Sequence, residues 1–260
     1  MDWERTRAAS GRVIELARTG STNADLVRAI GAGEEWPHLG VLLTRDQTAG
    51  RGRLDRRWVA PPGSALAVSV VVQVPRLPAA ARGWIPLVAG VAMRQAIAAQ
   101  ADGHEAGLKW PNDVLVRDDE GTARKICGVL AEATAAPDAV VIGTGVNTRL
   151  EPGDLPVPTA TSFPALGIVC DEDALVATYL SELDRLLVAL ASADGDAVAS
   201  GVHREASAMC LTLGREVSVS LPDGSALRGR AASLAPDGRL VVESADGPVA
   251  VSAGDVVHVR

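Results

Sequence analysis

Gln47-Thr48-Ala49-Gly50-Arg51-Gly52-Arg53-Leu54-Asp55-Arg56-Arg57-Trp58 is the most informative stretch of this chain. It follows a short apolar segment, Leu39–Thr44, whose pattern predicts a strand. Its glycines free the backbone to wrap around a ligand, because glycine reaches positive φ without steric cost. Its four arginines are permanently charged, planar donors that suit phosphate or carboxylate oxygens. We therefore expect a loop that closes over an anionic ligand, with Trp58 stacking on a base.

The composition is that of a globular, acidic protein. The chain has 260 residues, of which 47% are hydrophobic and 22% charged, so a packed core is expected. The formal net charge of −7 argues against a general nucleic-acid binder, which would present a broad basic surface. The arginine-rich loop is therefore a local concentration of positive charge in an acidic chain, and its role is expected to be local.

The cysteines and the apolar runs indicate the cellular compartment. Cys127, Cys170 and Cys210 stand far apart, without the C-x-x-C spacing of a zinc site, and fit a reducing cytoplasm. The N-terminus lacks the layout of a signal peptide. The longest apolar run, Trp84–Met93, is too short to span a bilayer. We expect a cytoplasmic protein with no membrane partner.

The hydrophobic pattern predicts an α+β fold with strands and helices interspersed. Strands are expected near residues 12–18, 39–44, 65–74, 114–116, 127–133 and 140–142, and helices near residues 24–30, 84–100 and 175–190. The proline-rich segment Pro152–Pro164 is expected to be a long connection without regular structure. From Arg215 onward, short apolar alternations are separated by three Asp-Gly pairs, which are preferred hairpin turns. We predict one domain over residues 1–212 and a small β-barrel over residues 213–260.

Further clusters have structural as well as functional interpretations when each is taken alone. Ser21-Thr22-Asn23 is typical of a helix cap, and Lys109–Asp113 contains ordinary turn chemistry. Lys125 opens an apolar strand in which Gly128 would let a ligand or another backbone approach closely. The glycine pair in Gly143–Asn147 is weak evidence, since G-x-G-x-x-G is absent.

Taken together and in this order, the clusters are specific. The motifs are Gly20-Ser21-Thr22-Asn23, Gln47-x-x-Gly50-Arg51-Gly52-Arg53-x-x-Arg56-x-Trp58, Leu108-Lys-Trp-Pro-Asn-Asp113, Lys125-x-x-Gly128-x-Leu-x-Glu132 and Gly143-x-Gly145-x-Asn147. The chain resembles the biotin protein ligases from about residue 17 to Arg260, and its ending resembles that of actinobacterial members. The resemblance implies a class II synthetase-like domain, with a mixed, largely antiparallel sheet and helices, followed by a small β-barrel.

The resemblance also implies a reaction. Biotin's carboxylate would attack the α-phosphate of ATP, supplied with Mg²⁺, to give biotinyl-5′-AMP, and a lysine of a biotin carboxyl carrier protein would then displace AMP. The implied catalytic residues are Arg51, Arg53, Lys125 and Asp113. The implied biotin-binding residues are Ser21, Thr22, Asn23, Gln47, Gly50, Arg51, Gly52, Arg53, Lys125 and Gly128. The implied ATP- and adenylate-binding residues are Arg51, Arg53, Arg56, Trp58, Lys109, Asn112 and Asn147, with no fixed metal site in the protein.

Two expectations concern the arginine-rich loop. The family loop usually has glycine where this chain has Asp55, whose negative charge could weaken retention of the adenylate. The loop has little apolar content, and ordering it costs about 1–2 kcal/mol of backbone entropy per residue. We therefore expect residues 50–58 to be disordered until a ligand binds.

Three other functions compete with the ligase. Lipoate or octanoate attachment uses an arginine-arginine, triple-glycine and histidine signature that this sequence lacks. A biotin sensor without catalysis would not need the phosphate-binding charges of Lys125 and the arginine-rich loop. An RNA-binding protein would not be acidic overall. We expect a short form without a winged DNA-binding domain, no nucleic-acid partner, and a monomer or weak homodimer.

Overall fold

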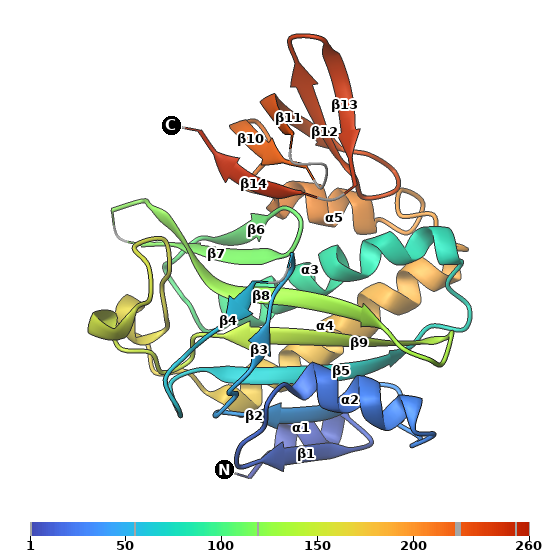
Figure 1. Ribbon diagram of the computed structural model, residues 1–260, viewed down its shortest axis with the longest axis vertical. Coiled ribbons are helices and arrows are strands. Elements are labelled where there is room, and N and C mark those ends of the chain that lie inside the picture. Colours follow the sequence, from blue (N-terminus) through green and yellow to red (C-terminus); the bar gives the residue numbers. More distant parts are fainter. Residues whose placement is uncertain (1, 55, 119, 222–224, 253, 260) are drawn as a thin grey trace.

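The computed structural model describes residues 2–54, 56–118, 120–221, 225–252 and 254–259, and its centre is a seven-stranded sheet (Figure 1). The strand order is β1-β2-β5-β9-β8-β7-β6; β1 runs parallel to β2, and the other neighbouring pairs are antiparallel. The strands are β1 (Val13–Leu16), β2 (Gly40–Thr44), β5 (Leu66–Gln73), β6 (Ala106–Lys109), β7 (Asp113–Arg117), β8 (Ala123–Ala133) and β9 (Ala139–Val146).

Helices cover the two faces of this sheet unequally (Figure 1). On one face lie α3 (Ile85–Ala98) and α4 (Glu172–Ser192), with α1 (Glu4–Ala9) packed on α4. On the other face lies α2 (Thr22–Gly31), over β2, β5 and β9. The remaining helix, α5 (Val202–Met209), packs between α3 and the C-terminal strands. The face that carries α2 is therefore the one left accessible for a binding site.

The alternation of side chains along β5 explains why the two faces of the sheet differ. Leu66, Val68, Val70 and Val72 belong to the large core beneath α3 and α4. The intervening residues face α2, where Val71 packs with Leu26 in a second, smaller cluster. The predominantly apolar character of α3 follows from its burial between the sheet and α4.

The C-terminal strands form a separate five-stranded antiparallel sheet with the order β13-β12-β11-β10-β14 (Figure 1). They are β10 (Glu216–Ser220), β11 (Ala226–Leu234), β12 (Leu240–Ser244), β13 (Gly247–Val251) and β14 (Asp255–His258). Two indole N–H groups hold the β11–β12 turn: Trp84 donates to the carbonyl of Pro236 at 2.9 Å, and Trp110 donates to that of Gly238 at 3.0 Å. Trp110 belongs to one of the sequence motifs, so this motif also attaches the small sheet to the large one.

The structure confirms the mixed, largely antiparallel sheet with helices and the additional C-terminal strands. It adds α1, β6, α5 and the two-residue strands β3 (Gly50–Arg51) and β4 (Arg57–Trp58), which the sequence pattern did not predict. Gly143 and Gly145 lie inside β9 and not in a loop after it. Residues 152–164 include 3₁₀ turns at Pro152–Asp154 and Pro164–Leu166. None of the described helices is long and apolar enough to cross a membrane.

Candidate active site

Two parallel rows of residues, all small except Leu130, form the floor of a pocket on the α2 face of the sheet. Across β5, β9 and β8, Ala67 pairs with Gly145 and Gly145 with Gly128. In the next row, Ser69 pairs with Gly143 and Gly143 with Leu130. A Cβ atom on Gly143 would lie 2.3 Å from Asn23 Oδ1, and one on Gly145 would lie 2.6 Å from Trp58 Cε2. The glycines are therefore required because Asn23 and Trp58 rest directly on the sheet.

The first turn of α2 forms one wall of the pocket. Ser21 is the N-cap residue, and its side chain accepts a hydrogen bond from the backbone N–H of Ala24. The Thr22 backbone N–H donates to Gln47 Oε1 at 3.0 Å, and the Ser69 hydroxyl lies 2.7 Å from Thr22 Oγ1. The helix cap and the polar pocket wall are thus the same segment, so Ser21-Thr22-Asn23 has a structural role and also lines the pocket.

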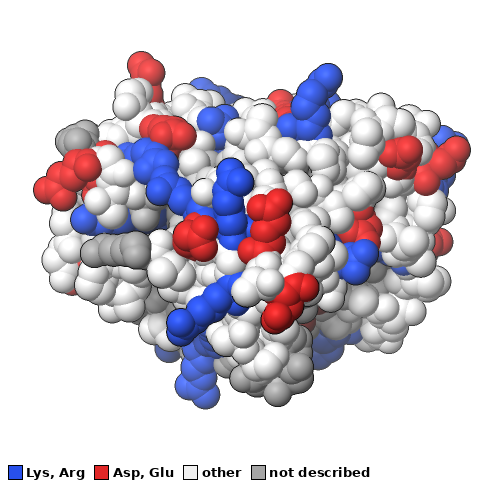
Figure 2. All heavy atoms as spheres, turned by 90° about the horizontal axis from the view of Figure 1, so that it is seen from above, with Lys and Arg blue, Asp and Glu red and all other residues white. Residues whose placement is uncertain are grey.

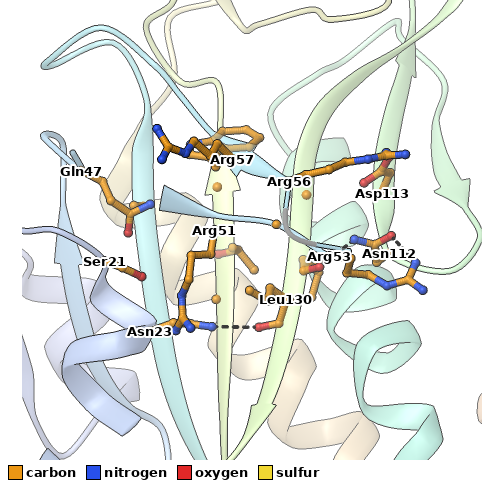
Figure 3. A pocket seen from close by; sticks show the side chains of 18 of the residues that line it. Ser21, Asn23, Gln47, Arg51, Arg53, Arg56, Arg57, Asn112, Asp113 and Leu130 are labelled. Atoms are coloured by element: carbon orange, nitrogen blue, oxygen red, sulfur yellow. Dashed lines mark hydrogen bonds between the residues drawn. The ribbon is translucent and has the colours of Figure 1, made fainter. Parts of the chain in front are cut away.

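The arginine-rich loop covers the pocket (Figure 3). Its two short strands pair Gly50 with Trp58 and Arg51 with Arg57. Arg51 and Arg53 point toward different ends of the pocket: Arg51 lies beside Asn23, and Arg53 lies beside Asn112 (Figure 3). Arg53 Nη1 donates to Asn112 Oδ1 at 3.2 Å. Asp55, whose charge was expected to affect ligand retention, lies outside the described residues.

Lys125 is held at the pocket by its backbone and by a carboxylate. Its Nζ lies 2.6 Å from Asp113 Oδ1. Its backbone N–H donates to the Thr159 carbonyl at 2.7 Å, and its carbonyl accepts from the Thr161 N–H at 2.8 Å. The segment expected to be an irregular connection therefore fixes the backbone of Lys125. A Cβ on Gly128 would lie 3.0 Å from Lys125 Nζ, so this glycine makes room for the lysine side chain.

The structure brings most of the predicted site residues to one pocket. The described residues that line it are Ser21, Thr22, Asn23, Gln47, Arg51, Gly52, Arg53, Leu54, Arg56, Arg57, Trp58, Ala67, Asn112, Asp113, Lys125, Gly128, Val129, Leu130, Gly143, Thr144, Gly145 and Gly254. Gly50 packs immediately behind, where a Cβ would lie 2.6 Å from Gln47 Nε2.

Besides Gly50, two predicted residues lie outside this lining. Asn147 is buried, and its side-chain N–H donates to the Thr161 carbonyl at 2.8 Å, so it supports the segment that holds Lys125. Lys109 lies close enough to His258, at the junction with the C-terminal sheet, to influence its protonation. Their assignment to the adenylate stays a prediction.

Sequence reasoning left two contributors, Glu132 and Ser69, out of the predicted site. Glu132, the last residue of a quoted motif, accepts hydrogen bonds from Asn23 Nδ2 at 2.8 Å and Arg51 Nη2 at 3.0 Å. Ser69, inside an apolar run, reaches Asn23 Oδ1 at 2.5 Å. The sequence did carry one signal for Ser69, because it is the only polar residue between Leu66 and Val72 in a strand that was expected to be buried.

The buried thiol near Lys125 has no nucleophilic role. Burial raises the pKa of Cys127 well above its ordinary value of 9.0, so the thiolate that would be required is not formed at neutral pH. Among the described residues there is also no group of three or more His, Cys, Asp or Glu side chains that could hold a metal ion. The charged side chains in the pocket lining are Arg51, Arg53, Arg56, Arg57, Lys125 and Asp113.

Comparisons with known proteins show the family of the chain. Residues 16–147 match the profile described as the Biotin/lipoate A/B protein ligase family, and residues 212–259 match the Biotin protein ligase C terminal domain. The chain is 38% identical to the biotin–[acetyl-CoA-carboxylase] ligase of Mycobacterium tuberculosis over 248 residues, covering 94% of this chain and 88% of that protein. It is 36% identical to the ligase of the same name from Paracoccus denitrificans over 154 residues, covering 54% and 59% of the two chains.

A solved structure shares the fold. The biotin protein ligase from Aquifex aeolicus in complex with biotin and ATP aligns with a TM-score of 0.75, covering 96% of this chain and 99% of that one. The sequence identity is 22%, so this similarity concerns the architecture alone. Family membership follows from the sequence matches. The chain belongs to the biotin/lipoate A/B protein ligase family, and within it to the biotin protein ligases.

Proposed function

We propose that this protein activates biotin with ATP to biotinyl-5′-AMP and transfers the biotinyl group to a lysine of a biotin carboxyl carrier protein. The observation that carries the proposal is one pocket with two chemically distinct ends. One end presents the polar groups of Ser21, Thr22 and Gln47 beside the paired charges of Arg51 and Glu132, and the other presents the cations Arg53 and Lys125. Biotin has the matching shape, with a polar ureido ring at one end and a carboxylate at the other.

In the first step, a carboxylate oxygen of biotin forms a bond to the α-phosphorus of ATP, and the bond to the β-phosphate oxygen breaks to release pyrophosphate. Both reactants are anions, so the barrier contains a large electrostatic repulsion. Lys125 and Arg53 are proposed to reduce it by binding the carboxylate and the α-phosphate together. Mg²⁺ enters with ATP as part of the substrate and screens the remaining phosphate charge.

In the second step, the ε-amine of the carrier lysine forms an amide bond to the acyl carbon, and the bond from that carbon to AMP breaks. The amine must lose a proton in this step. Asp113 is proposed to accept it, because its carboxylate lies at the pocket 2.6 Å from Lys125 Nζ. The covering loop, with Trp58 over Gly145, would keep water from the mixed anhydride until the carrier arrives.

The partners follow from this chemistry. The carrier is proposed to belong to an acyl-CoA carboxylase, as the name of the Mycobacterium tuberculosis relative implies for that protein. We propose that the protein binds no nucleic acid, since Lys and Arg are interspersed with Asp and Glu on the face shown in Figure 2 and the net charge is −7. We also propose that the protein is cytoplasmic and that it is a monomer or a weak homodimer. The boundary between its two domains is proposed to lie at residue 212.

A transfer experiment tests the function. The protein is incubated with MgATP, biotin and a purified biotin carboxyl carrier domain, and the carrier is weighed by mass spectrometry. We expect a mass increase of one biotinyl group on one lysine, and none when that lysine is replaced by arginine. An unmodified carrier in the presence of tight biotin binding would instead support a biotin sensor, and modification by lipoate would support lipoate attachment.

A further inference from the structure

Glu132 lies just outside the pocket lining, on the same face of β8 as Gly128 and Leu130. It pairs across the sheet with Val141, one row beyond the row of Ser69, Gly143 and Leu130. Its side chain is 23% exposed, and one of its oxygens, Oε2, receives hydrogen bonds from both Asn23 and Arg51. A carboxylate at the edge of a site for anionic substrates would repel them if it faced the ligand, so its position needs an explanation.

The hydrogen bonds of Asn23 show what this carboxylate fixes. The two hydrogens of its side-chain amide are donated to Glu132 Oε2 at 2.8 Å and to the Leu130 carbonyl at 3.1 Å. Its oxygen accepts from the Ser69 hydroxyl at 2.5 Å. Both donors of this amide are thus committed within the protein, and its orientation is determined. Asn23 therefore serves as a link between the sheet and the first turn of α2.

Arg51 is the second group that Glu132 holds. Its guanidinium Nη2 lies 3.0 Å from Glu132 Oε2, and its side chain passes beside Asn23 (Figure 3). The preceding backbone is already tied to the chain before α2, because the Ala49 N–H donates to the Gly20 carbonyl at 2.7 Å. The start of the arginine-rich loop is thus attached to the region of α2 twice, once through its backbone and once through Glu132.

We propose that Glu132 is a positioning residue, which holds Asn23 and Arg51 together at the ureido end of the pocket and so raises the affinity for biotin without touching it. This inference rests on the proposed function, because it assigns biotin's ring to that end. It also separates the roles of two arginines of the loop. Arg51 shapes the biotin end through Glu132, whereas Arg53 beside Asn112 serves the phosphate end.

Calorimetric titration of biotin in the absence of ATP tests the proposal. The proteins are the wild type, Glu132→Gln, Arg51→Gln and the double variant. We expect each single substitution to weaken biotin binding about tenfold, as for the loss of one hydrogen bond between charged groups. The double variant should bind no more weakly than the weaker single variant, because both substitutions remove the same contact. For Glu132→Gln the KM for ATP at saturating biotin should change by less than about twofold, since the substituted side chain contacts only Asn23 and Arg51 at the biotin end.

Three further variants separate positioning from general stability. Glu105→Gln removes an exposed ion pair of similar length, Glu105 to Arg117 at 2.6 Å, and should leave biotin binding unchanged. The double variant with exchanged charges, Glu132→Arg with Arg51→Glu, should bind biotin more tightly than the Glu132→Arg variant. Binding by Glu132→Gln within about twofold of the wild type, or additive losses in the double variant, would overturn the proposal. A wild type that binds no biotin would instead refute the proposed function.

Discussion

At the residue scale, the site depends on glycines whose role is to be small. Gly143 and Gly145 gave only weak evidence from sequence, because a lone glycine pair without G-x-G-x-x-G does not identify a binding site. In the structure they continue β9, and the space above them is occupied by Asn23 and by the ring of Trp58. A one-dimensional pattern cannot show which side chain from a distant segment will fill that space.

A substitution at Gly143 tests this account. In Gly143→Ala the new methyl group would meet the Asn23 amide, whose hydrogen bonds to Glu132, Leu130 and Ser69 would then be displaced. We expect the KM for biotin to rise by about tenfold or more, the effect of losing a hydrogen bond to a charged group. Gly153→Ala is the matched control, since a Cβ there meets nothing within 4 Å, and it should leave the KM unchanged.

At the element scale, the long helices and strands could be predicted from the sequence, whereas the short elements could not. The long helices α3 and α4 and the strand β5 were predicted close to their observed bounds, because α4 has an apolar stripe at helical spacing and α3 and β5 are long, mostly apolar runs. The helix α1 has six residues, with the sequence ERTRAA, and is fixed by a contact that no local pattern reveals: Asp173 accepts hydrogen bonds from Thr6. The pairing of Thr159 and Thr161 with Lys125 is likewise a long-range contact.

The arginine-rich loop provides the prediction at this scale. Its ladder consists of two residue pairs, Gly50 with Trp58 and Arg51 with Arg57, which is too little to hold an isolated hairpin. We therefore expect trypsin to cut after the loop arginines in the free protein and to cut much more slowly with biotin and MgATP present. Cleavage sites are identified by mass spectrometry, and equal cleavage rates in both samples would contradict closure of the loop over the ligands.

At the scale of the whole molecule, the two sheets meet around Thr212. Its hydroxyl oxygen accepts from the Trp110 backbone N–H at 3.0 Å and lies 3.2 Å from His258 Nε2 in β14. Burial, together with the charges of Lys109 and Arg215, lowers the pKa of His258 to about 4 from its ordinary value of 6.5. The sequence predicted a separate C-terminal unit, whereas these contacts link it to the motif that contains Trp110.

The lowered pKa of His258 predicts how stability depends on pH. Between pH 6.5 and 4 the unfolded chain binds a proton at this residue that the folded protein excludes, so stability falls as the pH decreases through this window. Because the ring is partly exposed, we expect its contribution to fall by about 1 kcal/mol between pH 7.5 and 5. Urea denaturation of the wild type and His258→Gln measures this difference, which should be absent in the variant. Equal slopes of stability against pH would contradict the prediction.

The central claim is that Lys125 and its neighbours activate biotin, and its most direct test is pyrophosphate release with MgATP and biotin, lipoate or octanoate. We predict release with biotin alone, and a loss of about 10²–10³-fold in kcat for Lys125→Ala, the usual cost of removing a preorganised charge-stabilising group. Release with lipoate or octanoate would contradict the assignment of the pocket. Undiminished release by Lys125→Ala, or no release despite tight biotin binding, would contradict the catalytic account itself.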